Sequence, residues 1–257
     1  LVATPIGNLA DITLRALETL AAADIVACED TRVSRVLLDR YGVRASLVSY
    51  HEHNESARAA ELVERMRGGA VVALVSDAGT PLISDPGYKL VRAARAAGHD
   101  VHTIPGPSAA IAALSLAGLP TDRFLFLGFL PAKAKARADA IADIAGVRAT
   151  LVIYESGPRL GETLLALSSG LGARDAAVAR ALTKLHEECV TGSLAQLAQR
   201  YVDAPPKGEI VIVVGPPPES AQATDDELDA ALDDVADFDA LPAVMSGAEA
   251  LEILSQT

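Results

Sequence analysis

Two acids and an arginine follow a short apolar run near the start of the chain and could carry acid–base chemistry. Ile25–Cys28 is typical of a buried strand, and Glu29, Asp30 and Arg32 come directly after it. A carboxylate held at the end of a strand can accept a proton, and an arginine can bind a phosphate. The same residues could instead cap and pair at the start of the next helix. Spacing alone leaves both interpretations open.

Small, turn-forming residues follow three apolar runs, at 1–3, 71–75 and 101–104. The three turns are Thr4–Asn8, Ser76–Pro81 and Pro105–Ala110. Small side chains let a ligand approach the backbone closely, and ligands of α/β proteins bind outside the carboxyl ends of the strands. Each turn alone would be an ordinary strand-to-helix connection. Together they predict one ligand site at the edge of a sheet.

A basic run lies in the middle of the chain and could bind the phosphates of RNA. The cations of the run are Lys133, Lys135 and Arg137. Two further arginines, Arg32 and Arg123, could act with them. A short basic run is more often the solvated start of a helix. Because this run lies just beyond a predicted domain boundary, RNA binding and a solvated helix start are about equally favoured as interpretations.

The other familiar motifs are missing from the sequence. It has no GxxxxGK[ST] phosphate loop, no GxGxxG fingerprint and no GxSxG elbow. His51 and His53 could lie on one face of a strand, but no further ligand at a familiar spacing completes a metal site. We therefore expect no metal.

Composition indicates a globular protein of one or two domains. Half of the 257 residues are hydrophobic, yet no apolar run approaches the roughly 18 residues of a membrane span. Two cysteines and no signal segment favour a reducing cytoplasm and no membrane partner. Of the 34 acids, eleven lie in residues 216–257, which leaves 23 acids against 22 Lys and Arg in the body. The net charge of −12 therefore does not exclude a local basic surface.

Strands alternating with helices along residues 1–215 predict an α/β fold with sheets covered on both faces. We place domains at 1–118 and 119–215, divided at the Gly118–Asp122 break, and an acidic, weakly helical segment at 216–257. Strands are expected at 1–3, 101–104 and 176–182. Helices are expected from Asp11 to about residue 20, and from Asp85 to residue 97.

Eight motifs occur in an order that resembles the tetrapyrrole-methylase superfamily, and its ribosomal RNA branch in particular. They cover about residues 1–215 and are Thr4–Leu9 (TPIGNL), Glu29–Arg32 (EDTR), Tyr50–Glu55 (YHEHNE), Ser76–Gly87 (SDAGTPLISDPG), Pro105–Ala110 (PGPSAA), Gly118–Pro120 (GLP), Gly128–Lys133 (GFLPAK) and Tyr154–Ser156 (YES). So many motifs in one order make the resemblance specific.

The resemblance implies two α/β domains of the class III type, with S-adenosyl-L-methionine in the cleft between them, and a homodimer. It also implies methylation of the 2′-hydroxyl of a cytidine in 16S rRNA of the small ribosomal subunit. The implied cofactor-binding residues are Pro5, Asp77, Ala78, Gly79, Thr80, Ser108, Ala109, Ala110, Tyr154, Ala181, Leu182, Thr183 and Gly208.

This sequence departs from the family pattern in two places. Ala181 stands where the family has a glutamate, so any contact from that carboxylate is absent. The family often ends in a basic helical RNA-binding domain, whereas residues 219–257 are acidic. Either this segment is truncated or divergent here, or RNA affinity must come from the body of the chain.

A methyl carried on a sulfonium is already activated, so the protein mainly aligns the reactants. A base, or a lysine that stabilises the oxyanion, would help a neutral ribose hydroxyl to attack. The candidates are Glu29, Asp30, Lys184 and His186, and the sequence does not choose among them. Methylation of a tetrapyrrole ring is one alternative. A non-catalytic, cofactor-binding protein that associates with ribosomal subunits is the other.

Overall fold

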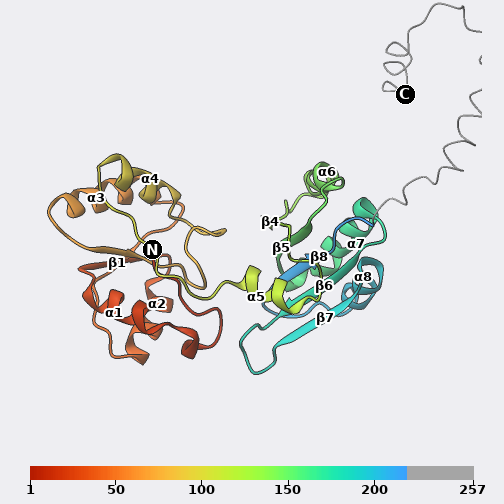
Figure 1. Ribbon diagram of the computed structural model, residues 1–257, viewed down its shortest axis with the longest axis horizontal. Coiled ribbons are helices and arrows are strands. Elements are labelled where there is room, and N and C mark those ends of the chain that lie inside the picture. The colour runs from red at the N-terminus through yellow and green to blue at the C-terminus, as the bar shows by residue number, and fades with distance from the viewer. Residues whose placement is uncertain (219–257) are drawn as a thin grey trace, which may run out of the picture. The chain divides into compact units, whose positions relative to one another are not determined.

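The computed structural model describes residues 1–218, in which Leu1–Pro217 form one unit (Figure 1). Residues 219–257, and with them most of the predicted acidic segment, lie outside the described residues. Within residues 1–218, no helix is both long and apolar enough to cross a membrane.

The first sheet has three parallel strands in the order β2-β1-β3. The strands are β1 (Ile25–Cys28), β2 (Leu47–Ser49) and β3 (Val72–Leu74). Val26 and Cys28 pack toward α1 (Leu14–Ala22) and α2 (Thr31–Arg40). Ile25 and Ala27 pack on the opposite side, toward α3 (Glu55–Arg67) and α4 (Tyr88–Ala96). Alternate residues of β1 thus fill two cores, as expected for a strand buried on both faces.

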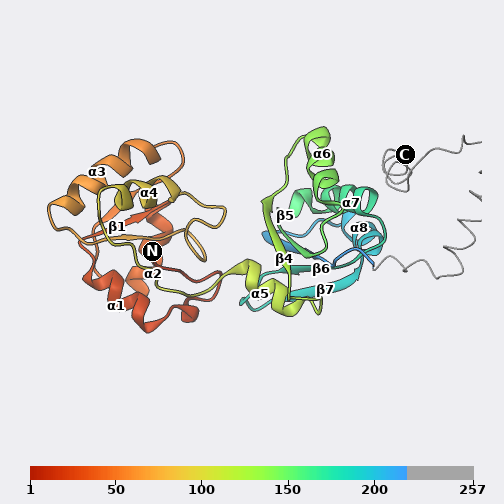
Figure 2. The ribbon, with the colours of Figure 1, turned by 45° about the horizontal axis from the view of Figure 1, so that its top comes forward.

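The second sheet has five strands in the order β4-β5-β8-β6-β7 (Figure 2). The strands are β4 (Phe124–Phe129), β5 (Thr150–Ser156), β6 (Asp175–Arg180), β7 (Glu188–Ser193) and β8 (Glu209–Val214). Only β4 and β5 are parallel, and the other pairs are antiparallel.

Helices cover both faces of this second sheet as well. One face packs against α5 (Ala109–Leu116) through Val152, Ala177 and Val213. The other face packs against α6 (Ala134–Ile144), α7 (Leu160–Leu171) and α8 (Leu194–Val202). The predicted α/β fold class is confirmed. The boundary near Gly118 stays a prediction, although α5, which precedes it, already packs on the second sheet.

Several predicted elements differ from the observed ones. The strands expected at 1–3 and 101–104 are wrong, because those segments form only a single bridge, Val2 to Ile104, beside β3. Strand β6 ends at Arg180 since Ala181 takes a left-handed φ of 50°. Strand β7 was not predicted, because its segment is polar and shows no apolar pattern.

Two helix starts also differ. Thr13 caps α1 through the N–H of Ala16 (3.1 Å), and Asp11 instead ends a short 3-10 turn, Leu9–Asp11. Helix α4 begins at Tyr88 and not at Asp85, because Gly87 has a φ of 139° that helical backbone does not permit.

Close packing of α7 on α8 generates the first prediction. A Cβ at Gly161 would lie 2.8 Å from the Cα of Val202, so Gly161→Ala must push the two helices apart. We expect the free energy of unfolding to fall by about 1–3 kcal/mol, measured by urea denaturation. The control is Gly146→Ala, where a Cβ meets nothing within 4 Å. Equal stability of the two variants would contradict this packing.

Candidate functional site

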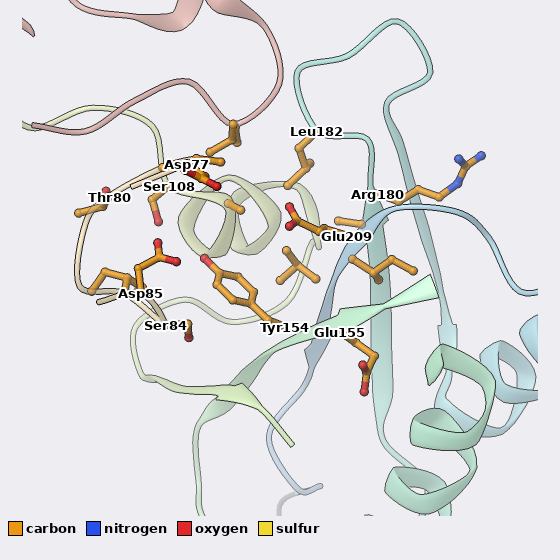
Figure 3. Close-up of a pocket in the computed structure, with 18 of the residues that line it drawn as sticks. Asp77, Thr80, Ser84, Asp85, Ser108, Tyr154, Glu155, Arg180, Leu182 and Glu209 are labelled. Carbon is orange, nitrogen blue, oxygen red and sulfur yellow. The ribbon is translucent and has the colours of Figure 1, made fainter. Parts of the chain in front are cut away.

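A cavity of about 310 Å³ lies where the loops after the strands of both sheets meet. Its walls include the turn after β3, the start of α5, Tyr154 on β5 and the residues after β6 (Figure 3). This volume is at the lower end of the range for small-molecule sites. The location agrees with the predicted ligand site at a sheet edge.

The turn Ser76–Pro81 is joined to both of the other predicted turns by hydrogen bonds. Thr4 and Gly79 exchange two main-chain bonds, from the Thr4 N–H to the Gly79 oxygen (2.9 Å) and from the Gly79 N–H to the Thr4 oxygen (3.1 Å). The Thr80 hydroxyl donates to the carbonyl of Pro107 (3.1 Å). The prediction that the three turns meet is confirmed.

The start of α5 presents main-chain donors to the cavity. The Ser108 side chain makes no capping bond to the helix, and Ser108 and Ala109 both line the cavity. The first N–H groups of a helix have no partner within it. They can therefore donate to a carboxylate or another acceptor of a ligand.

The loop after β6 closes the cavity with a strained backbone. Ala181 and Thr183 have left-handed φ angles of 50° and 63°. The Thr183 N–H donates to Oε2 of Glu187 (2.6 Å), and the Thr183 hydroxyl oxygen accepts from the N–H of Asn8 (3.0 Å). The second bond joins this loop to the first turn. Left-handed non-glycine residues that persist at a site indicate a conformation imposed by their surroundings.

Carboxylates dominate the polar lining of the cavity. Glu29, Asp77, Asp85 and Glu209 all line it, with Lys184 among the few cations. Burial, and then the nearby charges of Glu29 and Asp77, raise the pKa of Asp85 to about 6. Burial and the charge of Asp77 also raise the pKa of Glu29. An acidic cavity of this kind favours a positively charged ligand.

Nine of the thirteen predicted cofactor-binding residues line this cavity. They are Asp77, Ala78, Gly79, Thr80, Ser108, Ala109, Tyr154, Ala181 and Leu182. The other four lie beside it. Pro5 is buried in an adjoining pocket, Ala110 packs into the core under α5, Thr183 faces the neighbouring loop and Gly208 precedes the lining residue Glu209.

The four candidate catalytic residues divide into two pairs. Glu29 and Lys184 line the cavity, whereas Asp30 and His186 do not. Asp30 caps α2 and pairs with Arg32 (2.6 Å), and the bonds from Arg32 lower its pKa to about 2. A carboxylate with so low a pKa is a weak base, and one held outside the cavity is a poor candidate for the general base. The placement of Asp30 therefore supports the capping interpretation.

The predicted basic run is not uniformly exposed. Arg32, Arg123, Lys133 and Lys135 are exposed at the surface. Arg137 departs from the expectation, because its side chain is only 3% exposed and pairs with Glu162 (2.5 Å). It lies on the inner face of α6, so its guanidinium is not available to RNA.

Sequence reasoning missed several lining residues, including Asp85, Glu209 and Phe129. Asp85 stands inside the SDPG part of a turn motif, which is the one signal that could have found it. His51 and His53 lie outside the cavity, and residues 1–218 hold no group of three metal-binding side chains.

Comparisons with known proteins agree on one family. Residues 1–198 match the family described as Tetrapyrrole (Corrin/Porphyrin) Methylases. The chain is 59% identical to "Ribosomal RNA small subunit methyltransferase I" of Mesorhizobium japonicum, over 88% of this chain and 76% of the relative. Proteins of the same name from Erythrobacter litoralis and Escherichia coli O157:H7 are 57% and 49% identical, over 89% and 83% of this chain and 81% and 76% of the relative.

Solved structures support the fold alone. The uroporphyrin-III-C-methyltransferase of Thermus thermophilus has a TM-score of 0.59 at 24% identity, over 83% of this chain and 92% of that one. A diphthine synthase has a TM-score of 0.63 at 18% identity, over 83% of this chain and 88% of that one. These identities carry no argument about substrate.

The chain belongs to the tetrapyrrole methylase family and, within it, to the group of the small-subunit ribosomal RNA methyltransferases I. It is a methyltransferase whose methyl donor is S-adenosylmethionine. The cavity fits this donor in two respects. Its carboxylates suit the positive sulfonium and ammonium groups, and the open N–H groups of α5 suit the carboxylate of the donor.

The tight turn at Gly79 generates the second prediction. Gly79 has a φ of 83°, and a Cβ there would lie 3.3 Å from the Ile6 side chain at the cavity wall. We expect Gly79→Ala to weaken donor binding by about tenfold, which corresponds to roughly 1.4 kcal/mol, as measured by calorimetric titration. Gly98→Ala is the control, because Gly98 has a matching φ of 82° but no atom within 4 Å. Similar donor affinity in both variants would refute a specific role for this turn.

Proposed function

We propose that this protein transfers a methyl group from S-adenosylmethionine to the 2′-hydroxyl of a cytidine in 16S rRNA. The observation that carries the proposal is the 59% identity to a small-subunit rRNA methyltransferase over 88% of the chain. The cytidine and its 2′-oxygen come from the motif resemblance, above all the turns at Ser76–Gly87 and Pro105–Ala110.

The cavity supports methyl transfer by alignment. Main-chain groups at the joined turns hold the donor in one orientation, which lowers the entropic part of the barrier. Glu29 and Lys184 line the same cavity. Tyr154 packs edge-on against Phe126 and Phe129, with ring centroids 4.9 and 5.7 Å away, so its ring is fixed against the cavity.

The RNA would meet the protein on exposed cations of the body. Arg32 extends from the start of α2 with 88% of its side chain exposed, and Lys133 and Lys135 lie at the start of α6. Further parts of the proposal are a homodimer and a cytoplasmic location, where small ribosomal subunits are found. Both come from the family resemblance.

Transfer of labelled methyl tests the proposed function. Small subunits from cells that lack the endogenous enzyme should gain one labelled 2′-O-methylcytidine when incubated with this protein and the donor. Mapping by reverse transcription at low nucleotide concentration should place it at a single cytidine. Label on a base, on no RNA, or on an added porphyrinogen would contradict the proposal, and the last result would indicate tetrapyrrole methylation.

The exposed cations generate a further prediction. Removing the four positive charges of Arg32, Arg123, Lys133 and Lys135 by substitution with Ala should weaken subunit binding by more than about tenfold. The slope of log affinity against log salt should also become shallower. Arg67→Ala is the control, because Arg67 is an exposed cation paired with Glu64 on α3. An unchanged salt slope in the fourfold variant would place the RNA on another surface.

A further inference from the structure

We infer that Asp85 is a catalytic residue that accepts the proton of the attacking ribose hydroxyl. The inference rests on the proposed function and adds to it the residue that removes the proton. Glu29 and Lys184, the two earlier candidates that line the cavity, are then left with binding or orienting roles.

The loop that carries Asp85 is built to hold it in place. Leu82 and Ser84 have left-handed φ angles of 74° and 63°, which are rare for such residues. On the other side of Asp85, Gly87 has a φ of 139° and packs so closely that a Cβ would lie 2.7 Å from Leu74. Strained residues before this carboxylate and a tightly packed glycine after it indicate that its position is imposed by the fold.

A buried carboxylate anchors the end of this loop. Glu55, at the start of α3, is 8% exposed, and its Oε1 accepts a hydrogen bond from the Gly87 N–H (3.0 Å). Its Oε2 lies 3.3 Å from Nζ of Lys89. This anchor fixes the end of the loop, and Asp85, two residues before Gly87, lines the cavity. Figure 3 shows its carboxylate pointing toward Ser108 and the hydroxyl of Tyr154.

Two of the other acids that line the cavity, Asp77 and Glu155, are already engaged. Asp77 Oδ1 accepts the N–H of Asp30 (2.9 Å), and Asp30 pairs with Arg32. Glu155 is fully buried and accepts from the Thr163 hydroxyl (2.7 Å). Among residues 1–218, Asp85 has no ion pair with Lys, Arg or His. No cation of these residues therefore competes with a substrate for the Asp85 carboxylate.

Charge and burial make Asp85 a stronger base than an ordinary aspartate. Burial first, and then the charges of Glu29, Asp77 and Glu209, raise its pKa to about 6, while the hydroxyl of Ser76 partly offsets that rise. The hydroxyl of Tyr154 also faces it. Above that pH the side chain is deprotonated and can accept a proton, and below it the side chain is protonated and cannot. A base whose pKa lies close to the working pH combines availability with strength.

The step balances in atoms and charge. The ribose oxygen forms a bond to the methyl carbon, the bond from that carbon to sulfur breaks with both electrons going to sulfur, and the hydroxyl proton passes to the Asp85 carboxylate. The neutral aspartic acid then releases its proton to water after the products leave.

Asp85→Asn tests this inference, because the amide keeps the shape of the side chain but cannot take the proton. We expect kcat/KM for small-subunit methylation to fall by at least about 100-fold. The Kd for the donor, measured by calorimetric titration of the same protein, should stay within about threefold. Wild-type kcat/KM should decline as pH falls through about 6, since this parameter reports the free enzyme. That decline should be absent in the variant.

Glu209→Gln is the charge-matched comparison, since it removes one carboxylate from the same cavity. It should retain the decline in kcat/KM near pH 6, with any loss appearing in donor affinity. Asp39→Asn, on the exposed side of α2, should match the wild type in every readout.

Three results would overturn the inference. One is activity of Asp85→Asn within about threefold of wild type. Another is a loss of donor affinity as large as the loss of rate, which would make Asp85 a ligand of the donor's positive charge. The third is disappearance of the pH dependence in Glu29→Gln and not in Asp85→Asn. If the wild-type protein itself methylates no subunit, the proposed function fails and this inference falls with it.

Discussion

Two main-chain hydrogen bonds between Thr4 and Gly79 are the constraint on which the site depends. They join the first turn of the chain to the turn after β3, and the Thr80 hydroxyl extends the connection to Pro107. Because these bonds use backbone atoms, they require small residues that let the chains approach. The left-handed φ of Gly79 meets the same need. One geometric requirement thus explains why glycine and alanine are concentrated at the walls of the cavity.

The cavity and a set of exposed side chains of the protein carry charges of opposite sign, which suit two kinds of ligand. Five acidic residues line the cavity and suit a cationic methyl donor, while exposed arginines and lysines suit the phosphates of RNA. Methyl transfer removes the positive charge of the sulfonium. The product therefore gains less than the donor from the acidic lining, which favours its release. Burial, together with the acids around it, also raises the pKa of Asp85, so the arrangement that suits a cationic donor also suits the proposed proton transfer.

The sequence was sufficient to predict the fold class and the meeting of the three turns, because both depend on local chemistry. Small-residue turns after apolar runs are visible as residue types, and their meeting follows from α/β topology. The direction of a side chain was harder to predict. Arg137 belongs to a basic run but points inward to Glu162, and Asp85 reaches the cavity only through the left-handed backbone at Leu82 and Ser84. Such angles are set by tertiary packing, which a single sequence does not display.

Hydrogen–deuterium exchange with and without S-adenosylmethionine tests the central claim most directly, because it reports on main-chain groups. Donor binding should slow exchange in the segments 77–80, 108–110 and 181–183, and leave helices α3 and α8 unchanged. This pattern would place the donor at the joined turns. Protection confined to other segments, with these three unaffected at saturating donor, would contradict the account.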